Sequence, residues 1–194
     1  MTELEMLSSG SLLEMLFLGA AEEGDVRAQM TMGWMHRNGE GIPRDDIKAA
    51  FWFEKAAQQG DKDAQYYLGM MYREGEGVLQ DDRQAAVWLT KAAAQTYGPA
   101  SYQLGLLFAS GRGVTQNDER AVAYYQKAAE EGESEAQLLL GLMYANGRGI
   151  NRNTQKALHW LLLASESTNP DIAKRARQAA TQVEAAILKL KNAT

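Results

Sequence analysis

The sequence AQYYLGMMYREGEGVLQDDRQAAVWLTKAA, Ala64 to Ala93, is one complete copy of a pattern that occurs four times in this chain. Each copy starts 36 residues after the previous one, and the four copies open with Ala28, Ala64, Ala100 and Ala136. A period of this length indicates stacked supersecondary units. Because one unit cannot bury its own apolar face, we expect the copies to stack into a solenoid.

One copy of the pattern predicts a helical hairpin. From Ala64 to Arg73 the apolar residues recur every three and four positions, as in an amphipathic helix. Gly75-Glu76-Gly77 should end that helix, since glycine adopts the left-handed backbone of a helix C-terminus without strain. Asp81 can then cap a second helix that runs through Lys91-Ala92-Ala93. The chain as a whole is therefore predicted to be all-α.

Small residues recur inside each hairpin and predict close helix packing. We expect a glycine on the first helix and an alanine on the second to let the two helices approach, with an aromatic residue filling the space behind. The glycines are Gly33, Gly69, Gly105 and Gly141, the alanines Ala49, Ala85, Ala121 and Ala157, and the aromatic residues Trp52, Trp88, Tyr124 and Trp160.

The pattern A-x-x-x-L-G-x-x-Y-x-x-G-x-G-V-x-x-D-x-x-x-A-x-x-W-x-x-K-A-A closely resembles the Sel-one-like repeat (SLR) family, which is related to tetratricopeptide (TPR-like) repeats. The resemblance covers Ala28 to about Asp171. It implies a right-handed α-solenoid, or superhelix, in which the first helices line a concave groove. It also implies a role as an adaptor or scaffold in protein-protein interaction, commonly in bacteria, and no reaction.

The two ends of the array are predicted to be single capping helices. The sequence LFLGAAEEGD, Leu16 to Asp25, aligns one period before Trp52 to Asp61, so it resembles a second helix without its first. After Asn169-Pro170 the apolar residues favour a last helix that seals the array, with a dimer seam as the alternative. The predicted boundaries are 1–27 for the first capping helix, 28–63, 64–99, 100–135 and 136–170 for the repeats, and 171–194 for the last helix.

Composition argues against several classes of function. The net charge of −5 with dispersed signs disfavours nucleic acid as a partner, and the absence of cysteine excludes disulfides and thiolate metal sites. His36 stands where other copies have Tyr72, Phe108 or Tyr144, so it is interpreted as a core residue. We predict no catalytic, cofactor-binding or metal site. The resemblance leaves a β-lactam-binding or hydrolysing enzyme as a minor alternative, although no serine is followed three residues later by lysine.

The N-terminal segment lacks the features of an export signal. Its apolar stretch contains Glu14, follows Glu3 and Glu5, and precedes the first positive charge at Arg27. This favours the cytoplasm, with a periplasmic or secreted protein as the alternative if a signal peptide had been removed before Met1. No apolar run reaches membrane-spanning length, so no membrane partner is expected.

The predicted partner site is the groove face of the first helices. Two rows of large apolar residues, followed by arginines in the first two copies, remain there once the residues that face the second helix are set aside. Exposed apolar rows typically mark interaction sites, and tyrosine, tryptophan and methionine are enriched in interfaces. The alternative is that neighbouring copies bury these rows. The residues, called the groove residues below, are Met30, Trp34, Arg37, Tyr66, Met70, Arg73, Tyr102, Leu106, Leu138 and Leu142.

Two functional hypotheses follow. The first is an adaptor that holds another protein or a peptide segment in the groove, where Arg37 and Arg73 bind a carboxylate of that partner. The second is a dedicated inhibitor or immunity-type protein that blocks a bacterial enzyme or toxin. The chain itself is expected to be a monomer, or a dimer through the last helix.

Overall fold

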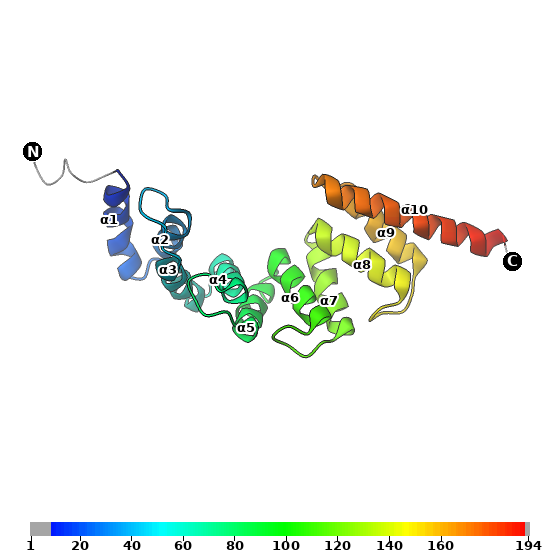
Figure 1. The fold of residues 1–194 in the computed structure, drawn as a ribbon, viewed down its shortest axis with the longest axis horizontal. Coiled ribbons are helices and arrows are strands. Elements are labelled where there is room, and N and C mark those ends of the chain that lie inside the picture. The colour runs from blue at the N-terminus through cyan, green and yellow to red at the C-terminus, as the bar shows by residue number, and fades with distance from the viewer. Residues whose placement is uncertain (1–8, 193–194) are drawn as a thin grey trace, which may run out of the picture. The chain divides into compact units, whose positions relative to one another are not determined.

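The computed structural model describes residues 9–192, with side chains from 12 to 189, and every regular element in that range is an α-helix (Figure 1). The all-α prediction is confirmed. The helices are α1 (Ser9–Glu22), α2 (Val26–Asn38), α3 (Asp46–Gln58), α4 (Lys62–Glu74), α5 (Asp82–Ala93), α6 (Gly98–Ser110), α7 (Asp118–Glu130), α8 (Ser134–Asn146), α9 (Thr154–Ser165) and α10 (Pro170–Asn192).

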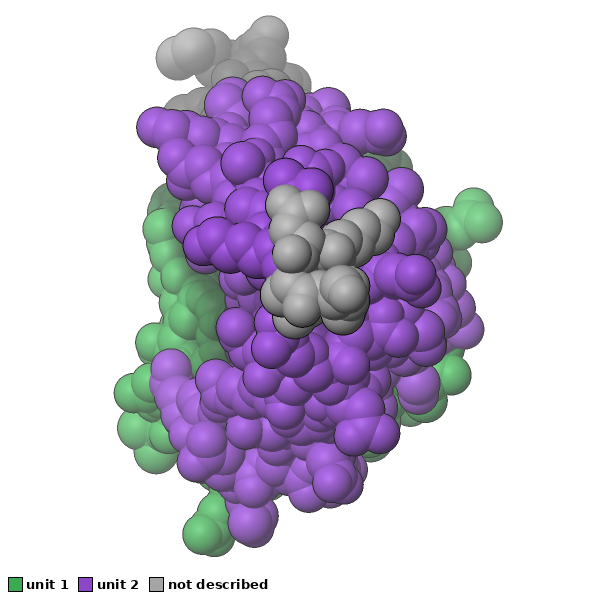
Figure 2. Space-filling model, turned by 90° about the vertical axis from the view of Figure 1, so that its right-hand side faces the viewer, with its two compact units in different colours: residues 1–95 green, residues 96–194 purple. Residues whose placement is uncertain are grey.

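The chain forms two compact units, which are coloured separately in Figure 2. Unit 1 is residues 1–95 and contains α1 to α5; unit 2 is residues 96–194 and contains α6 to α10. In unit 1, α2 pairs with α3 and α4 with α5, while α3 contacts α4. In unit 2, α6 pairs with α7 and α8 with α9, while α7 contacts α8. The predicted hairpins are confirmed, although each first helix begins two residues before the predicted boundary.

Two of the Gly-x-Gly loops, those that contain Gly77 and Gly149, both end a helix and contact the preceding repeat of their own unit. Gly75 has φ +74° and its N–H donates to the Met71 carbonyl at 2.8 Å, as expected of a helix C-terminus. Gly77 has φ +67°, and a Cβ there would collide with the backbone carbonyl of Asp46, in the first turn of α3. Gly149 stands in the same way against the backbone of Asp118 in α7. The second glycine therefore permits an inter-repeat contact that the interpretation as a helix stop did not include.

Side-chain caps start the second helices where the sequence predicts them. The Asp45 carboxylate accepts from Lys48 N–H at 3.0 Å, and the Asn117 side chain accepts from Arg120 N–H at 2.8 Å. Asp81 and Asn153 cap α5 and α9 in the same manner. Such a cap satisfies a backbone N–H that the helix cannot, and contributes about 1 kcal/mol.

The core of each hairpin is the crossing of its two helices. A Cβ built on Gly69 would lie 2.8 Å from Leu89, and one on Gly105 would lie 2.5 Å from Tyr125. Gly33 and Gly141 make the same contact with the corresponding residues of α3 and α9. The space that each glycine leaves is thus occupied by the residue that follows the predicted aromatic position, for example Leu89 after Trp88. That aromatic position is buried at Trp52 and Trp88 in unit 1, but half-buried at Tyr124 and Trp160 in unit 2.

Single helices flank the hairpins, as predicted. In unit 1, α1 contacts α2, and its residues Phe17, Leu18 and Ala21 join the core around Met32. In unit 2, α10 contacts α9 and α8 and buries an apolar stripe that includes Ile172, Ala176 and Val183. That stripe is used within unit 2, which favours the sealing role over the dimer seam. The helical spacing of the sequence also predicts Leu190 on this stripe, but its side chain lies outside the described residues.

Candidate interaction surface

In unit 1 the groove residues form an aromatic cluster on α2 and α4. The Trp34 ring makes edge contacts with Tyr67 at 4.5 Å and with Phe53 at 5.4 Å, measured between ring centroids. Tyr66 contacts Tyr67 at 5.2 Å. All the groove residues of unit 1 are half-buried. Intermediate burial of this kind does not decide between a partner surface and rows that neighbouring repeats cover, so the partner site stays a prediction.

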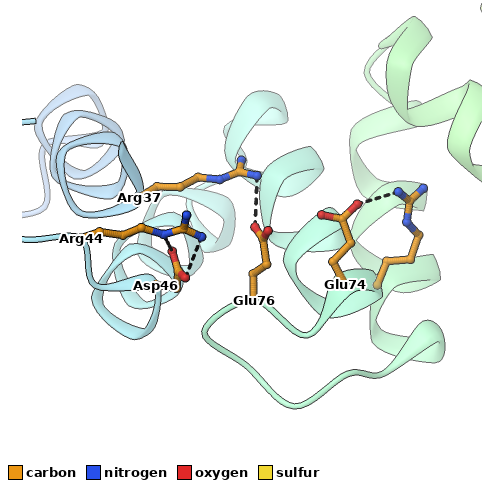
Figure 3. Close-up of polar contacts among 6 residues, drawn as sticks. Arg37, Arg44, Asp46, Glu74 and Glu76 are labelled. Atoms are coloured by element: carbon orange, nitrogen blue, oxygen red, sulfur yellow. Dashed lines mark hydrogen bonds and ion pairs between the residues drawn. The ribbon is translucent and has the colours of Figure 1, made fainter. Parts of the chain in front are cut away.

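The two groove arginines already engage carboxylates of this chain, and Figure 3 shows the pair of Arg37 with Glu76. Arg37 Nη2 lies 3.2 Å from Glu76 Oε2, and its guanidinium carbon is 5.7 Å from the Trp34 ring centroid. Arg73 Nη2 lies 2.7 Å from Glu74 Oε1. A partner's carboxylate would have to displace these contacts. This weakens the hypothesis that the two arginines bind an acidic group of the partner.

In unit 2 the groove residues lie on α6 and α8, and one of them differs from expectation. Tyr102, Leu106 and Leu142 are half-buried, but Leu138 is only 2% exposed. Helix α8 is contacted by three helices of its unit, α7, α9 and α10. The assignment of Leu138 to the partner surface is corrected accordingly, and it belongs to the core.

Two pockets open beside Leu142 in unit 2. The first has a volume of about 250 Å³ and lies on α6, α7 and α8. The second has a volume of about 210 Å³ and lies between α8, α10 and the loop before α9. Alanines Ala109 and Ala145, where unit 1 has Arg37 and Arg73, make room for them. The first is lined by Ala109, Tyr125, Leu139, Leu142, Met143, Asn146 and Arg148; the second by Leu142, Ala145, Asn146, Arg152, Thr154, Ala179, Gln182, Val183 and Ala186.

One ion pair stands at the edge of the first pocket. Arg148 makes two hydrogen bonds to the Asp118 carboxylate, at 2.9 and 2.8 Å. These bonds lower the pKa of Asp118 and raise that of Arg148. Tyr125 is buried behind the pocket, and desolvation raises the pKa of its hydroxyl, so it stays neutral at physiological pH. The pocket thus presents apolar walls and one positively charged rim residue that is already paired.

Sequence reasoning missed several residues of this surface. Tyr67 and Leu139 follow the first groove row by one position, and their apolar or aromatic character was a usable signal. Tyr125 and Met143 were not identified, because their side chains meet the pocket from the packed side of α7 and α8. The lining from α10 depends on how that helix docks, which no periodicity encodes.

No group of three or more His, Cys, Asp or Glu side chains is placed to hold a metal ion in the part of the chain that the structure describes. His36 is buried, as predicted, with Nε2 3.9 Å from the Glu14 carboxylate. Burial is the main cause that lowers its pKa, the nearby Lys48 adds to it, and Glu14 and Asp45 oppose it. Within residues 9–192, no helix combines the length and apolarity needed to cross a bilayer.

The repeat model of one family matches almost the whole hairpin array. The Sel1 repeat model matches residues 26–61, 62–97, 98–133 and 134–169, in the frame set by the first helices of the structure. The chain belongs to the Sel1 repeat family. This confirms the resemblance drawn from the repeated pattern, since Sel1 and Sel-one-like repeats are the same family.

Solved Sel1 structures are similar to this chain in sequence and fold. The protein c5321 of uropathogenic Escherichia coli, described as a protective antigen with an SLR fold, is 36% identical with a TM-score of 0.77 over 81% of this chain. A Sel1 repeat protein from Oxalobacter formigenes is 29% identical with a TM-score of 0.76 over 82% of this chain. The chain spans 33% and 64%, respectively, of the length of these two proteins. No curated protein matches this chain.

Proposed function

We propose that this protein is a non-catalytic adaptor that binds a segment of another protein on the first helices of unit 2. Sel1 repeats commonly mediate protein-protein interaction, which gives the class of function. The observation that carries the proposal is the pair of pockets on either side of Leu142, on the face where the repeat pattern leaves large apolar residues.

The shape and chemistry of these pockets favour an apolar side chain of the partner as the anchor. Leu142 is half-buried and lines both pockets, so two neighbouring side chains of one segment can straddle it. Interface energy is concentrated in a few residues that fill such pockets, and truncating one commonly costs about 2 kcal/mol or more. Asn146 lines both pockets as well and can hydrogen-bond the backbone of the bound segment.

The test is affinity capture from the native host, followed by calorimetry with the captured protein. We expect Leu142→Lys to weaken binding at least tenfold, which corresponds to about 1.4 kcal/mol. Ala109→Trp, which fills the first pocket, should weaken it similarly. Circular dichroism should show that both variants keep the helical fold, so that a loss of binding reports on the surface.

A matched control lies in the same unit. Leu162 is an exposed leucine on α9 that lines neither pocket, and Leu162→Lys introduces the same change of charge. It should bind the partner as tightly as the unmodified chain. If Leu162→Lys loses the partner while Leu142→Lys retains it, the proposed surface is wrong.

A further inference from the structure

Arg152 of unit 2 occupies a repeat position whose side chain is engaged within its own hairpin in the other three copies of the pattern. In two of them the residue is a glutamine. The Gln80 amide donates to the Arg73 carbonyl at 2.9 Å, and the Gln116 amide donates to the Ala109 carbonyl at 3.1 Å. Both carbonyls belong to the last turn of the preceding first helix, so each glutamine helps to end that helix.

The first copy has an arginine at this position, as the fourth copy does. Arg44 Nε donates to Asp46 Oδ1 at 2.8 Å and Arg44 Nη2 donates to Asp46 Oδ2 at 2.9 Å (Figure 3). Two parallel bonds of this kind are the usual way in which a guanidinium binds a carboxylate. One change separates the fourth copy from the first, since Thr154 stands where Asp46 would be. Among residues 12–189, the exposed Arg152 side chain has no ion pair or hydrogen bond.

Arg152 and Thr154 both line the second pocket beside Leu142, which has a volume of about 210 Å³. The other polar side chains of its lining, Asn146 and Gln182, are uncharged, so Arg152 is the one charge there and no acid lines the pocket. The rim arginine of the first pocket, by contrast, is already paired. The second pocket therefore lacks the carboxylate that the first copy of the repeat supplies from its own chain.

The rest of the second pocket is apolar. Leu142, Val183 and three alanines make up this part of its lining. A basic group would place a like charge beside Arg152, which disfavours such an occupant. An inorganic anion would leave the apolar wall in contact with water. A peptide segment that carries a carboxylate next to an apolar side chain satisfies both parts of the pocket.

We propose that the second pocket binds an aspartate or glutamate side chain of the partner segment, with its carboxylate on Arg152 as Asp46 lies on Arg44. An apolar side chain beside that acid then packs against Leu142. The inference rests on the function proposed for unit 2 and names the chemistry of the segment bound there.

The test is a selection of random peptides displayed on phage against the full-length chain. Each peptide is followed by the coat protein, so it offers side-chain carboxylates and no free C-terminus. We expect the enriched peptides to share an aspartate or glutamate close to a large apolar residue. One enriched peptide, synthesised with both ends capped, and its analogue with the acid replaced by the amide then serve as probes in calorimetry.

Substitution of the arginine tests the pairing with the acid of the peptide. Arg152→Gln should weaken the acidic peptide about fivefold and leave the amide analogue nearly unchanged, because only the acid loses a charged partner. Arg175→Gln is the matched control, since Arg175 is exposed on α10 and lines neither pocket. It should leave the affinity of both peptides unchanged.

Restoring the carboxylate within the chain tests the comparison with the first copy. Thr154→Asp places an acid where Asp46 stands, so it should occupy Arg152 and weaken the acidic peptide about fivefold. Thr154→Asn has the same size without the charge and should bind that peptide as the unmodified chain does. Thr154 is the first residue of α9, where an acid is favourable, so the helix should persist in both variants.

Three results would overturn the proposal: enriched peptides without an acidic residue, equal responses of the acidic and amide peptides to Arg152→Gln, or equal affinities of Thr154→Asp and Thr154→Asn. Leu142→Gln separates this failure from that of the proposed function. Peptides that are lost with Leu142→Gln but kept with Arg152→Gln would leave the adaptor surface in place and refute the acidic segment. Peptides that bind Leu142→Gln at full strength, or a selection that enriches no peptide, would refute both.

Discussion

The two units use the same repeat positions differently. In unit 1, Arg37 and Arg73 fill the groove side of α2 and α4 and pair with Glu76 and Glu74. In unit 2 the same position is alanine, at Ala109 and Ala145, and pockets take the place of the side chains. The repeated residues maintain the hairpin in both units, so the variable positions are free to make one surface charged and aromatic and the other hollow and apolar.

The two units also differ in the charge of the middle residue of the Gly-x-Gly loop, which is Glu76 in unit 1 and Arg148 in unit 2. Arg148 in unit 2 reaches back to Asp118, the first residue of the preceding second helix. The corresponding pair in unit 1 would be Glu76 with Asp46, two acids, and Asp46 instead binds Arg44 of its own loop (Figure 3). Glu76 is thereby left to pair with the groove arginine Arg37. One change of sign therefore alters the groove as well as the loop.

The largest expected difference between the units is at the aromatic position of the second helix. Trp88 is 8% exposed, belongs to a core cluster with Leu68, and its ring centroid is 3.8 Å from Lys91 Nζ. Trp88→Ala should lower the free energy of unfolding by about 3 to 5 kcal/mol, since it leaves a large cavity. Trp160 is half-buried, so Trp160→Ala should cost clearly less. Urea denaturation giving equal losses would contradict this difference.

A second prediction tests a contact that the two units share. Gly77→Ala and Gly149→Ala should each cost at least about 2 kcal/mol, because strain at positive φ adds to a collision with the neighbouring helix. Gly60→Ala is the control: φ is +96°, but a Cβ there meets nothing within 4 Å. It should cost less in the same denaturation assay. If all three cost the same, the inter-repeat contact contributes nothing.

Much of the fold could be predicted from the sequence because its determinants are local. Period, glycine stops and caps such as Asp45 and Asn117 need only the residues of one hairpin. The partner of the glycine was missed, since Phe53 and Leu89 differ in type and obscure a shared role. The burial of Leu138 and the pairing of Arg37 with Glu76 depend on how neighbouring repeats approach, which the spacing does not specify.

A smaller effect is expected from a glutamine ladder confined to unit 1. The Gln95 amide donates to Gln65 Oε1 and to the Gly60 carbonyl, both at 2.9 Å, and Gln59 does the same with Gln29 and Gly24. Gln95→Ala should cost about 1 kcal/mol because Gln65 loses a partner. In unit 2 the position is the exposed Glu131, and Glu131→Ala should be neutral by chemical denaturation. If Glu131→Ala lowered the free energy of unfolding more than Gln95→Ala, the ladder would not stabilise unit 1.

The smallest effect concerns the Arg148–Asp118 pair in unit 2. Arg148 lowers the pKa of Asp118 in the folded chain, so the pair stabilises the fold above the unfolded pKa, and this contribution disappears as pH falls through the folded pKa. Because both groups are largely solvated, Arg148→Met should cost less than about 1 kcal/mol at pH 7. At pH values below the folded pKa of Asp118, Arg148→Met should leave the free energy of unfolding unchanged. Denaturation along a series of falling pH values checks this, and a loss that does not shrink as the pH falls would implicate packing instead of charge.

The most direct test of the adaptor function is site-specific photo-crosslinking in the native host. A benzophenone amino acid is placed at Leu106, a groove residue of α6, or at Ala123, an exposed residue of α7. We predict a discrete crosslinked protein from Leu106 and none from Ala123, with the Leu106 product lost when Leu142→Lys is added. Crosslinks from Ala123 but not from Leu106 would contradict the claim that the first helices carry the partner.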